Sequence, residues 1–389
     1  MITHEPTELE ECSEILTGAA RDRKRVAFVG GGTSLELGNA GAEPDLVLST
    51  RKLDRVVEYA PEDQVIVAEA GLTLARLREV AAPNAQWFGV DAPLAERATL
   101  GGLVAVGGFG PRRLRYGGMR ELLLGITLLR ADGASAQSGS KVVKNVAGFD
   151  LPKVMCGALG TLGLVGRVTL RLHPSPETSR TSIVVGTSAT GVVELVRTLR
   201  RAQLEPSSVV ALRRGAARYD VGVRFEGFER GVRHDVERFM SLLPEAEHAT
   251  PSPAEAAQFW ADHDAARSEG ALRVRPNALS THLPEVEALL EPLLGSLEAP
   301  RFAWYASLGV GFSSGAPTSV PRALEALTLA RSGLLRLGGS LVVDAAPPAV
   351  RGHFDAFGPL PSAFPIMQAL KQRFDPERRL NTGRFVGGL

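Results

Sequence analysis

Glycine is concentrated in four short segments within the first 170 residues, and each segment lies between apolar runs. The first, Gly30–Ser34 (GGGTS), follows the apolar run Val26–Val29. Because glycine has no Cβ, successive backbone N–H groups can converge on a phosphate, and the two hydroxyls add donors. The loop is not a Walker A motif, and Leu35 stands where a GxGxxG fingerprint needs its third glycine. Taken alone, it is equally well explained as a turn that binds nothing.

The other three glycine segments are Ala98–Gly110 (ATLGGLVAVGGFG), Lys141–Asp150 (KVVKNVAGFD) and Gly157–Val165 (GALGTLGLV). The first has the spacing of a short buried helix followed by a loop that approaches a flat or polar group. The second offers a lysine, Lys144, that could stabilise negative charge. Each segment has an ordinary alternative: tight packing, solvated lysines, or a helix-to-strand turn. Four of them together favour a ligand-binding fold.

Hydrophobic periodicity predicts an α+β protein. Helices are expected over 7–20 and 73–82, with short strands between them. The most regular strand is expected at Leu162–Leu172. Two prolines within His173–Glu177 disfavour both helix and strand pairing, so a domain boundary is expected near residue 175.

Beyond this boundary the pattern changes to strands that alternate with amphipathic helices. Over 176–360 we expect helices on one face of an antiparallel sheet. Residues 361–389 are expected to form a helix over 363–374 and an extended tail. The domain prediction is therefore 1–175, 176–360 and 361–389.

Composition excludes several function classes for this chain of 389 residues. The net charge of +1 gives no reason to expect nucleic acid as a partner. Two cysteines, Cys12 and Cys156, are too few for a disulfide framework, a zinc site or an iron–sulfur cluster. The N-terminus has no basic and apolar pattern of a signal peptide, and no run of about 18 apolar residues is present. We expect a cytoplasmic protein, with any membrane association made through partners.

Together, the segments GGGTS, ATLGGLVAVGGFGPRR and GTLGLV, in this order and spacing, resemble the FAD-binding domain of the vanillyl-alcohol oxidase (PCMH-type) family. Within that family, the ending FDPERRLNTGRF and the segment from Lys141 to Pro174 are most similar to FAD-binding subunits of bacterial glycolate oxidases. The resemblance implies a two-subdomain FAD-binding domain (1–175), an α+β cap domain (176–360) and a C-terminal segment (361–389) that packs back on the FAD domain.

The resemblance also implies the cofactor, FAD, and the residues that hold it. Asn381 would lie near the flavin, in Asn-Thr-Gly where the family usually has Asn-Pro-Gly. Since the glycine loop has no histidine or cysteine, we expect FAD to be non-covalent. The implied contacts are, for the pyrophosphate, Gly30, Gly31, Gly32, Thr33 and Ser34; for the ribityl chain and phosphates, Ala98, Thr99, Leu100, Gly102 and Ala105, with Gly108 near the ring; and for the adenosine half, Gly160, Thr161, Gly163 and Val165.

Catalytic residues are not evident from the sequence. Family members that oxidise 2-hydroxy acids carry Gly-Glu-His in the cap, tied to a metal, whereas the matching segment here, 338–347, has no Glu-His. We therefore expect no metal, and only Lys144, Arg112 and Tyr116 are candidates. His353 is isolated, and a lone histidine is more often structural.

Three functions remain open at this point. The first is an FAD-carrying subunit of a glycolate (2-hydroxy acid) oxidase complex, working beside a catalytic flavin subunit and an iron–sulfur subunit. The second is a self-sufficient dehydrogenase, in which Arg112, Arg115, Tyr116 and Lys144 bind the carboxylate of a 2-hydroxy acid substrate. The third is a flavin-free interaction protein that kept the fold.

Overall fold

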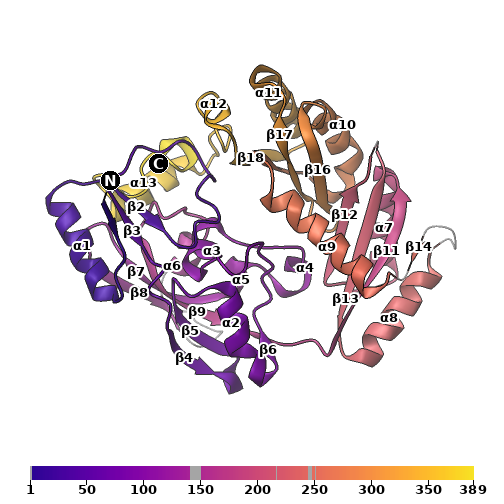
Figure 1. Ribbon diagram of the computed structural model, residues 1–389, viewed down its shortest axis with the longest axis horizontal. Coiled ribbons are helices and arrows are strands. Elements are labelled where there is room, and N and C mark those ends of the chain that lie inside the picture. Colours follow the sequence, from indigo (N-terminus) through magenta and orange to yellow (C-terminus); the bar gives the residue numbers. More distant parts are fainter. Residues whose placement is uncertain (1, 141–149, 216, 244–247, 250) are drawn as a thin grey trace. The chain divides into compact units, whose positions relative to one another are not determined.

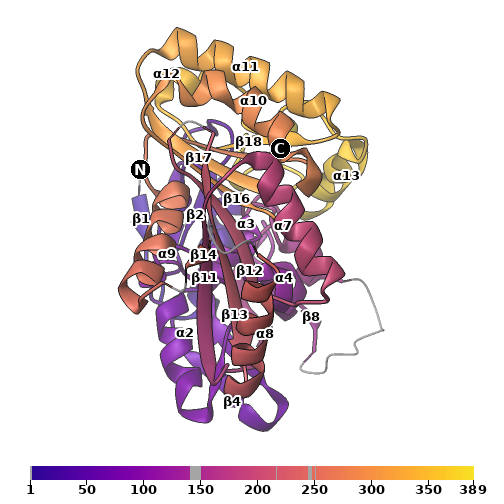
Figure 2. The same cartoon turned by 90° about the vertical axis from the view of Figure 1, so that its right-hand side faces the viewer.

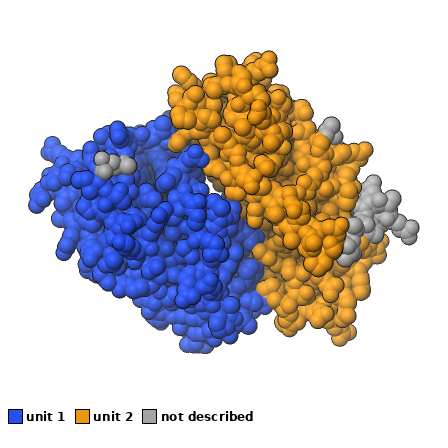
Figure 3. Space-filling view, viewed as in Figure 1, with its two compact units in different colours: residues 1–110, 117–175, 359–389 blue, residues 111–116, 176–358 orange. Residues whose placement is uncertain are grey.

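The computed structural model divides into two compact units, which Figure 3 shows in different colours. Unit 1 consists of 1–110, 117–175 and 359–389, and unit 2 of 111–116 and 176–358. The structure describes residues 2–140, 150–215, 217–243, 248–249 and 251–389.

Unit 1 begins with a three-stranded parallel sheet of order β1-β3-β2. Helix α1 (Leu9–Arg21) packs on this sheet because its buried positions, among them Cys12 and Leu16, follow the helical period. The strands are β1 (Ile2–His4), β2 (Val26–Val29) and β3 (Leu46–Ser49).

The second sheet of unit 1 has five antiparallel strands in the order β4-β5-β9-β7-β8. Its core centres on Ile66, Val168 and Leu170, which are fully buried under short helices. The strands are β4 (Val56–Ala60), β5 (Val65–Glu69), β7 (Leu123–Leu129), β8 (Ser135–Gly139) and β9 (Leu164–Arg171). The helices are α2 (Leu74–Ala81), α3 (Leu100–Val106), α5 (Met119–Leu122) and α6 (Leu151–Met155).

Two small features complete unit 1. A short pair joins β6 (Gln86–Trp87) to β10 (His173–Pro174). The chain then returns to unit 1 through α13 (Phe364–Phe374), and the segment after this helix bridges Leu380 to Val26 of β2. Figure 1 shows α13 and the C-terminus in yellow. Phe374, at the end of α13, packs against the core of the second sheet. The two sheets agree with the expected two-subdomain α+β architecture.

Unit 2 contains one antiparallel sheet of eight strands, in the order β14-β11-β13-β12-β16-β17-β15-β18. Alternate side chains of β13, such as Val221, Val223 and Phe225, point to its main core. The strands are β11 (Thr178–Thr187), β12 (Ser208–Arg213), β13 (Tyr219–Gly227), β14 (His248–Ala249), β15 (Leu272–Asn277), β16 (Leu297–Tyr305), β17 (Val310–Pro317) and β18 (Ser340–Ala345).

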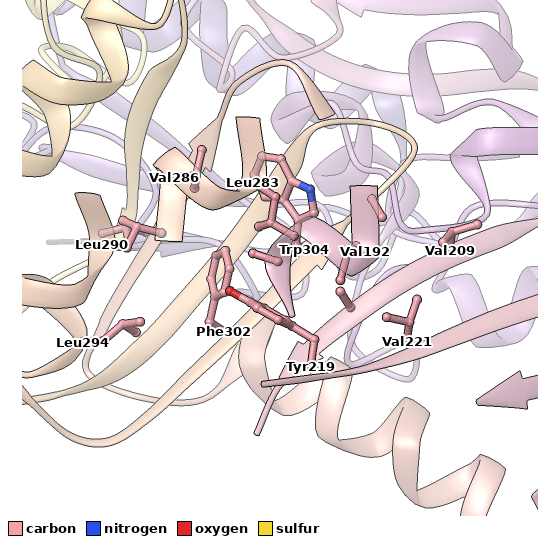
Figure 4. Close-up of a cluster of buried hydrophobic side chains, with 14 of the residues drawn as sticks. Val192, Val209, Tyr219, Val221, Leu283, Val286, Leu290, Leu294, Phe302 and Trp304 are labelled. Carbon is pink, nitrogen blue, oxygen red and sulfur yellow. The ribbon is translucent and has the colours of Figure 1, made fainter. Parts of the chain in front are cut away.

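Helices cover both faces of this sheet, whereas the sequence predicted one covered face. The main core lies under α7, α8, α10 and α11, and Figure 4 shows its centre around Trp304 and Phe302. Helix α9 lies on the opposite face, where the Phe259 ring fits against Gly222, since a Cβ there would lie 2.4 Å from the ring. Figure 2 shows α10 beside α11. The helices are α4 (Arg113–Tyr116), α7 (Ala189–Arg201), α8 (Glu229–Ser241), α9 (Pro253–Ser268), α10 (Leu283–Leu294), α11 (Val320–Arg336) and α12 (Pro348–Arg351).

Within the described part of the chain, no helix combines the length and the apolar character needed to cross a membrane.

Candidate functional site: a glycine-walled pocket in unit 1

Unit 1 contains a pocket that is walled largely by glycine-rich backbone. Three of the four glycine segments and the C-terminal segment form its walls. The predicted cofactor residues that line it are Gly30, Gly31, Gly32, Thr33, Ser34, Thr99, Gly102, Ala105, Gly160, Gly163, Val165 and Asn381. Ala98, Leu100, Gly108 and Thr161 are absent from this lining. Ala98 and Leu100 are buried in the core of unit 1, and Thr161 faces a second cavity.

The glycine loop leaves backbone donors available at the pocket wall. Gly31 N donates to Thr99 Oγ1 over 3.4 Å. Among the described residues, the N–H groups of Gly32, Thr33 and Ser34 have no hydrogen-bond acceptor. Gly32 is in the left-handed region at φ 72°, which orients successive N–H groups toward one side. Three unpaired amides in a row are the arrangement that an anionic phosphate group requires.

Glycine is required in this loop because the chain passes very close to residues 97–99. A Cβ on Gly31 would lie 1.6 Å from the carbonyl oxygen of Arg97, and a Cβ on Gly30 would lie 2.2 Å from Thr99 Oγ1. Any larger residue would therefore push the loop away from α3. Close backbone packing therefore explains why glycine stands at these two positions.

Three arginines that the sequence analysis did not select surround the same loop. Arg51 Nε donates to Gly30 O over 3.1 Å, and Arg97 Nη2 donates to Gly31 O over 3.5 Å. Arg384 Nη2 donates to Ser34 O over 2.7 Å. These cations make the loop electropositive, which favours a diphosphate. Nothing in their local sequence marks them, because the contacts join residues far apart in the chain.

Helix α3 contributes a smooth surface rather than free donors. Its N-cap Thr99 accepts from Gly102 N over 3.3 Å, and Gly101 N donates to Ala70 O over 2.8 Å. The small residues Gly102 and Ala105 line the pocket without filling it. This surface fits a chain or ring that lies along the helix.

The turn that precedes β9 has an unusual backbone. Leu159 lies at φ 52°, Gly160 at φ 72° and Gly163 at φ 157°. Asn381 contacts this turn, since its Nδ2 donates to Leu159 O over 2.6 Å and its Oδ1 accepts from Phe28 N over 3.1 Å. The Asn381 side chain therefore joins β2 to the turn at the pocket wall.

The catalytic candidates are located in less favourable surroundings. Arg112, in unit 2, makes a bidentate pair with Glu226, with Nη2 and Oε1 2.6 Å apart. Burial raises the pKa of Glu226, but the hydrogen bonds and charge of Arg112 outweigh this effect and hold it below its ordinary value. Arg115 donates to Glu226 O, and its guanidinium lies 5.9 Å from the centre of the Tyr116 ring. Lys144 lies outside the described residues.

These observations fit FAD at the pocket of unit 1. The pocket supplies unpaired amides and cations for a diphosphate and a small-residue surface for the remainder of the cofactor. Among the described residues, no group of three or more His, Cys, Asp or Glu side chains is arranged to hold a metal ion.

Comparisons with known proteins identify the same domain. Residues 2–137 match a family model described as an FAD binding domain, and this range includes the glycine loop and α3. Residues 2–137 are therefore identified as an FAD binding domain. A solved structure, alkyldihydroxyacetonephosphate synthase, is similar over 97% of this chain and 76% of its own, with a TM-score of 0.74 and 14% identity, which concerns the fold alone.

Curated proteins similar to this chain include a D-lactate dehydrogenase from Archaeoglobus fulgidus, 37% identical over 169 residues (43% of this chain and 38% of the relative). Another is glycolate oxidase subunit GlcE of Escherichia coli, 35% identical over 125 residues (32% of this chain and 36% of the relative). The chain spans less than half the length of either relative.

Proposed function

We propose that this chain is the FAD-carrying subunit of a glycolate (2-hydroxy acid) oxidase or dehydrogenase complex. The observation that carries the proposal is the pocket of unit 1, where the amides of Gly32, Thr33 and Ser34 lack acceptors among the described residues. Bound FAD would supply a two-electron acceptor that can also pass electrons singly. We propose non-covalent binding, because the glycine loop has no histidine or cysteine.

Different residues of the pocket would hold different parts of FAD. The Gly30–Ser34 amides would donate to the diphosphate, and Arg51 and Arg97 would offset its charge. The surface of α3 at Gly102 and Ala105 would allow close approach by the flavin side of the molecule, and the 159–165 turn would meet the adenosine side.

We place most of the substrate chemistry on a partner chain. The segment 338–347, which includes Asp344, has no Glu-His pair. The Asp344 carboxylate lies 3.2 Å from Arg275 and is therefore already charge-paired. The GlcE relative is named as a subunit, which supports an assembly. The proposed partners are a catalytic flavin subunit and an iron–sulfur subunit, in the cytoplasm or attached to the membrane through those partners.

The test is to purify the chain alone and to isolate it with its partners from the native host. An absorbance spectrum should show flavin in the isolated chain, and acid precipitation should release that flavin into the supernatant. With glycolate or D-lactate and a dye acceptor, the isolated chain should turn over far more slowly than the complex. Rapid turnover by the isolated chain would contradict the division of labour.

A second candidate is a self-sufficient FAD-dependent 2-hydroxy acid dehydrogenase. The 37% identity to a D-lactate dehydrogenase favours it, although the match covers 38% of that relative. The same assay separates the two candidates. A flavin-free interaction protein is disfavoured by the match of residues 2–137 to an FAD binding domain and by the open amides of the glycine loop.

A further inference from the structure

The turn at 157–163 contributes a strained residue to the pocket wall. Leu159 occupies the left-handed region at φ 52°, where its Cβ is crowded by the backbone. Both Leu159 and Gly160 line the pocket. A strained backbone persists only where neighbouring structure holds it in place, and such positions cluster at functional sites. The contacts that hold this turn therefore bear on the shape of the cofactor site.

The C-terminal segment fixes the carbonyl groups on both sides of Gly160. On one side, Asn381 Nδ2 donates to Leu159 O over 2.6 Å. On the other, Lys371 Nζ donates to Thr161 O over 2.7 Å. The peptide units that flank Gly160 are thus each held by a side chain from the same short stretch of chain.

The ammonium group of Lys371 is buried and donates three hydrogen bonds. Its side chain is 1% exposed, and its ammonium group donates to Thr161 O, to Asp375 Oδ2 over 2.7 Å and to Leu380 O over 3.0 Å. Asp375 in turn accepts from the backbone N–H groups of Arg379 and Leu380. Burial lowers the pKa of Lys371, and the hydrogen bond with Asp375 acts in the opposite direction.

Such a pair is not explained by stability alone. A buried ion pair can often be replaced by apolar residues of similar volume at no cost in stability, because desolvation offsets the attraction between the charges. What an apolar residue cannot provide is a donor directed at Thr161 O. The geometry of the turn is therefore the property that depends on the charge of Lys371.

The same C-terminal segment also holds a second wall of the pocket, the glycine loop. Arg384 donates to the carbonyl oxygens of Ser34, Leu35 and Leu37 over 2.7, 3.0 and 2.9 Å. The stretch from Lys371 to Arg384 therefore contacts both the turn before β9 and the glycine loop.

We infer that Lys371 is a positioning residue for the cofactor. Residues 371–384 act as one unit that sets the distance between the 157–163 turn and the glycine loop in the FAD pocket. The inference rests on FAD binding, which is part of the proposed function. It predicts that FAD affinity depends on Lys371 even though this residue does not line the pocket and its hydrogen bond to the turn is made to Thr161 O.

The experiment compares FAD binding by the full-length apo-protein and its variants, from the change in flavin fluorescence at a temperature where each is folded. Lys371→Met keeps the length of the side chain but removes the donor. Since it leaves the Asp375 carboxylate buried without its cation, the double variant Lys371→Met/Asp375→Asn is measured as well. The expected result is a dissociation constant about 10- to 100-fold higher, as for the loss of a charge-assisted hydrogen bond. Arg384→Gln is expected to weaken binding in the same direction.

The matched control is Leu290→Ala, which removes a fully buried side chain from the core of unit 2. It lowers the melting temperature of the apo-protein but is expected to leave FAD affinity unchanged, so loss of stability alone is separated from loss of positioning. Wild-type FAD affinity in the folded Lys371→Met/Asp375→Asn variant overturns the inference. Failure of the unchanged protein to bind FAD at all overturns the proposed function, and the inference with it.

Discussion

Replacement of Gly31 by alanine tests whether the glycine loop binds the cofactor through its backbone. The new Cβ would lie 1.6 Å from Arg97 O, and real Cβ contacts are essentially never shorter than 3.0 Å, so the loop and residue 97 must separate by about 1.4 Å. A shift of this size moves the amides of Gly32 and Thr33 out of hydrogen-bond range of a bound diphosphate.

The expected magnitude follows from the bonds that are lost. A hydrogen bond to a charged group contributes about 1.5–3 kcal/mol, so each lost amide contact should weaken FAD binding by about 10- to 150-fold. Isothermal titration of the apo-protein with FAD measures the change directly. Gly18→Ala in α1 is the control, since a Cβ there meets nothing within 4 Å. It should leave FAD affinity unchanged and stabilise the helix by up to about 1 kcal/mol. Wild-type affinity in folded Gly31→Ala would refute the backbone-donor account.

Three further predictions concern buried ionisable groups. Arg112→Ala leaves the fully buried Glu226 carboxylate without its ion-pair partner and should reduce the free energy of urea unfolding by about 3–5 kcal/mol. Arg112→Ala/Glu226→Gln should recover most of this loss. An unchanged free energy of unfolding in Arg112→Ala would show that the pair does not stabilise the fold. The folded-state pKa of Glu226 lies below its ordinary value of 4.5, so its ionised form stabilises the protein above that pH, and this stabilisation is lost as the pH falls through the folded-state pKa. Glu226→Gln should therefore flatten the decline of melting temperature with pH below about 4.5. An equally steep decline in the variant would contradict the assignment. Burial raises the pKa of the Cys12 thiol to about 12; in a Cys156→Ser background, Cys12 should react with a thiol reagent only after unfolding, and rapid labelling of the native protein would be inconsistent with this burial.

The sequence was most informative where function depends on local backbone geometry. A strand followed by three glycines has few uses, and the structure puts Gly30–Ser34 at the wall of a pocket. Not every residue of the glycine segments lines this pocket. Leu100 belongs to a glycine segment, yet it points into the core of unit 1, because alternate sides of the short helix α3 face the pocket and the sheet.

The elements that sequence analysis missed are those held by tertiary contacts rather than by local preference. Strand β17 reads VGFSSGAP, in which small and polar residues have weak strand propensity. It forms because β15 and β16 pair with it on either side. Helix α9, by contrast, lies where the sequence predicts an amphipathic helix, and it buries Phe259, His263 and Ala266. Its position on the second face of the sheet could not be read from periodicity.

Lys371 and Arg384 illustrate a further limit of the sequence. The hydrogen bond from Lys371 joins residues 210 positions apart, and that from Arg384 joins residues 350 positions apart. Each residue lies in an unremarkable charged stretch of the C-terminal segment. Their roles depend on the return of this segment to β2, which only the folded chain establishes.

The charge pairing of unit 2 also bears on where a substrate carboxylate would bind. For a substrate to use Arg112, it would have to displace Glu226 and leave that carboxylate buried without a partner, at a cost of about 3–5 kcal/mol. The new charge-assisted hydrogen bond would return only about 1.5–3 kcal/mol. Arg275 meets the same difficulty, because it is paired with Asp344. If FAD binds at the open backbone donors of unit 1 while Arg112 and Arg275 of unit 2 stay paired, the chain is better suited to carry FAD than to select a hydroxy acid. This imbalance is the physical reason for placing substrate recognition on a partner subunit.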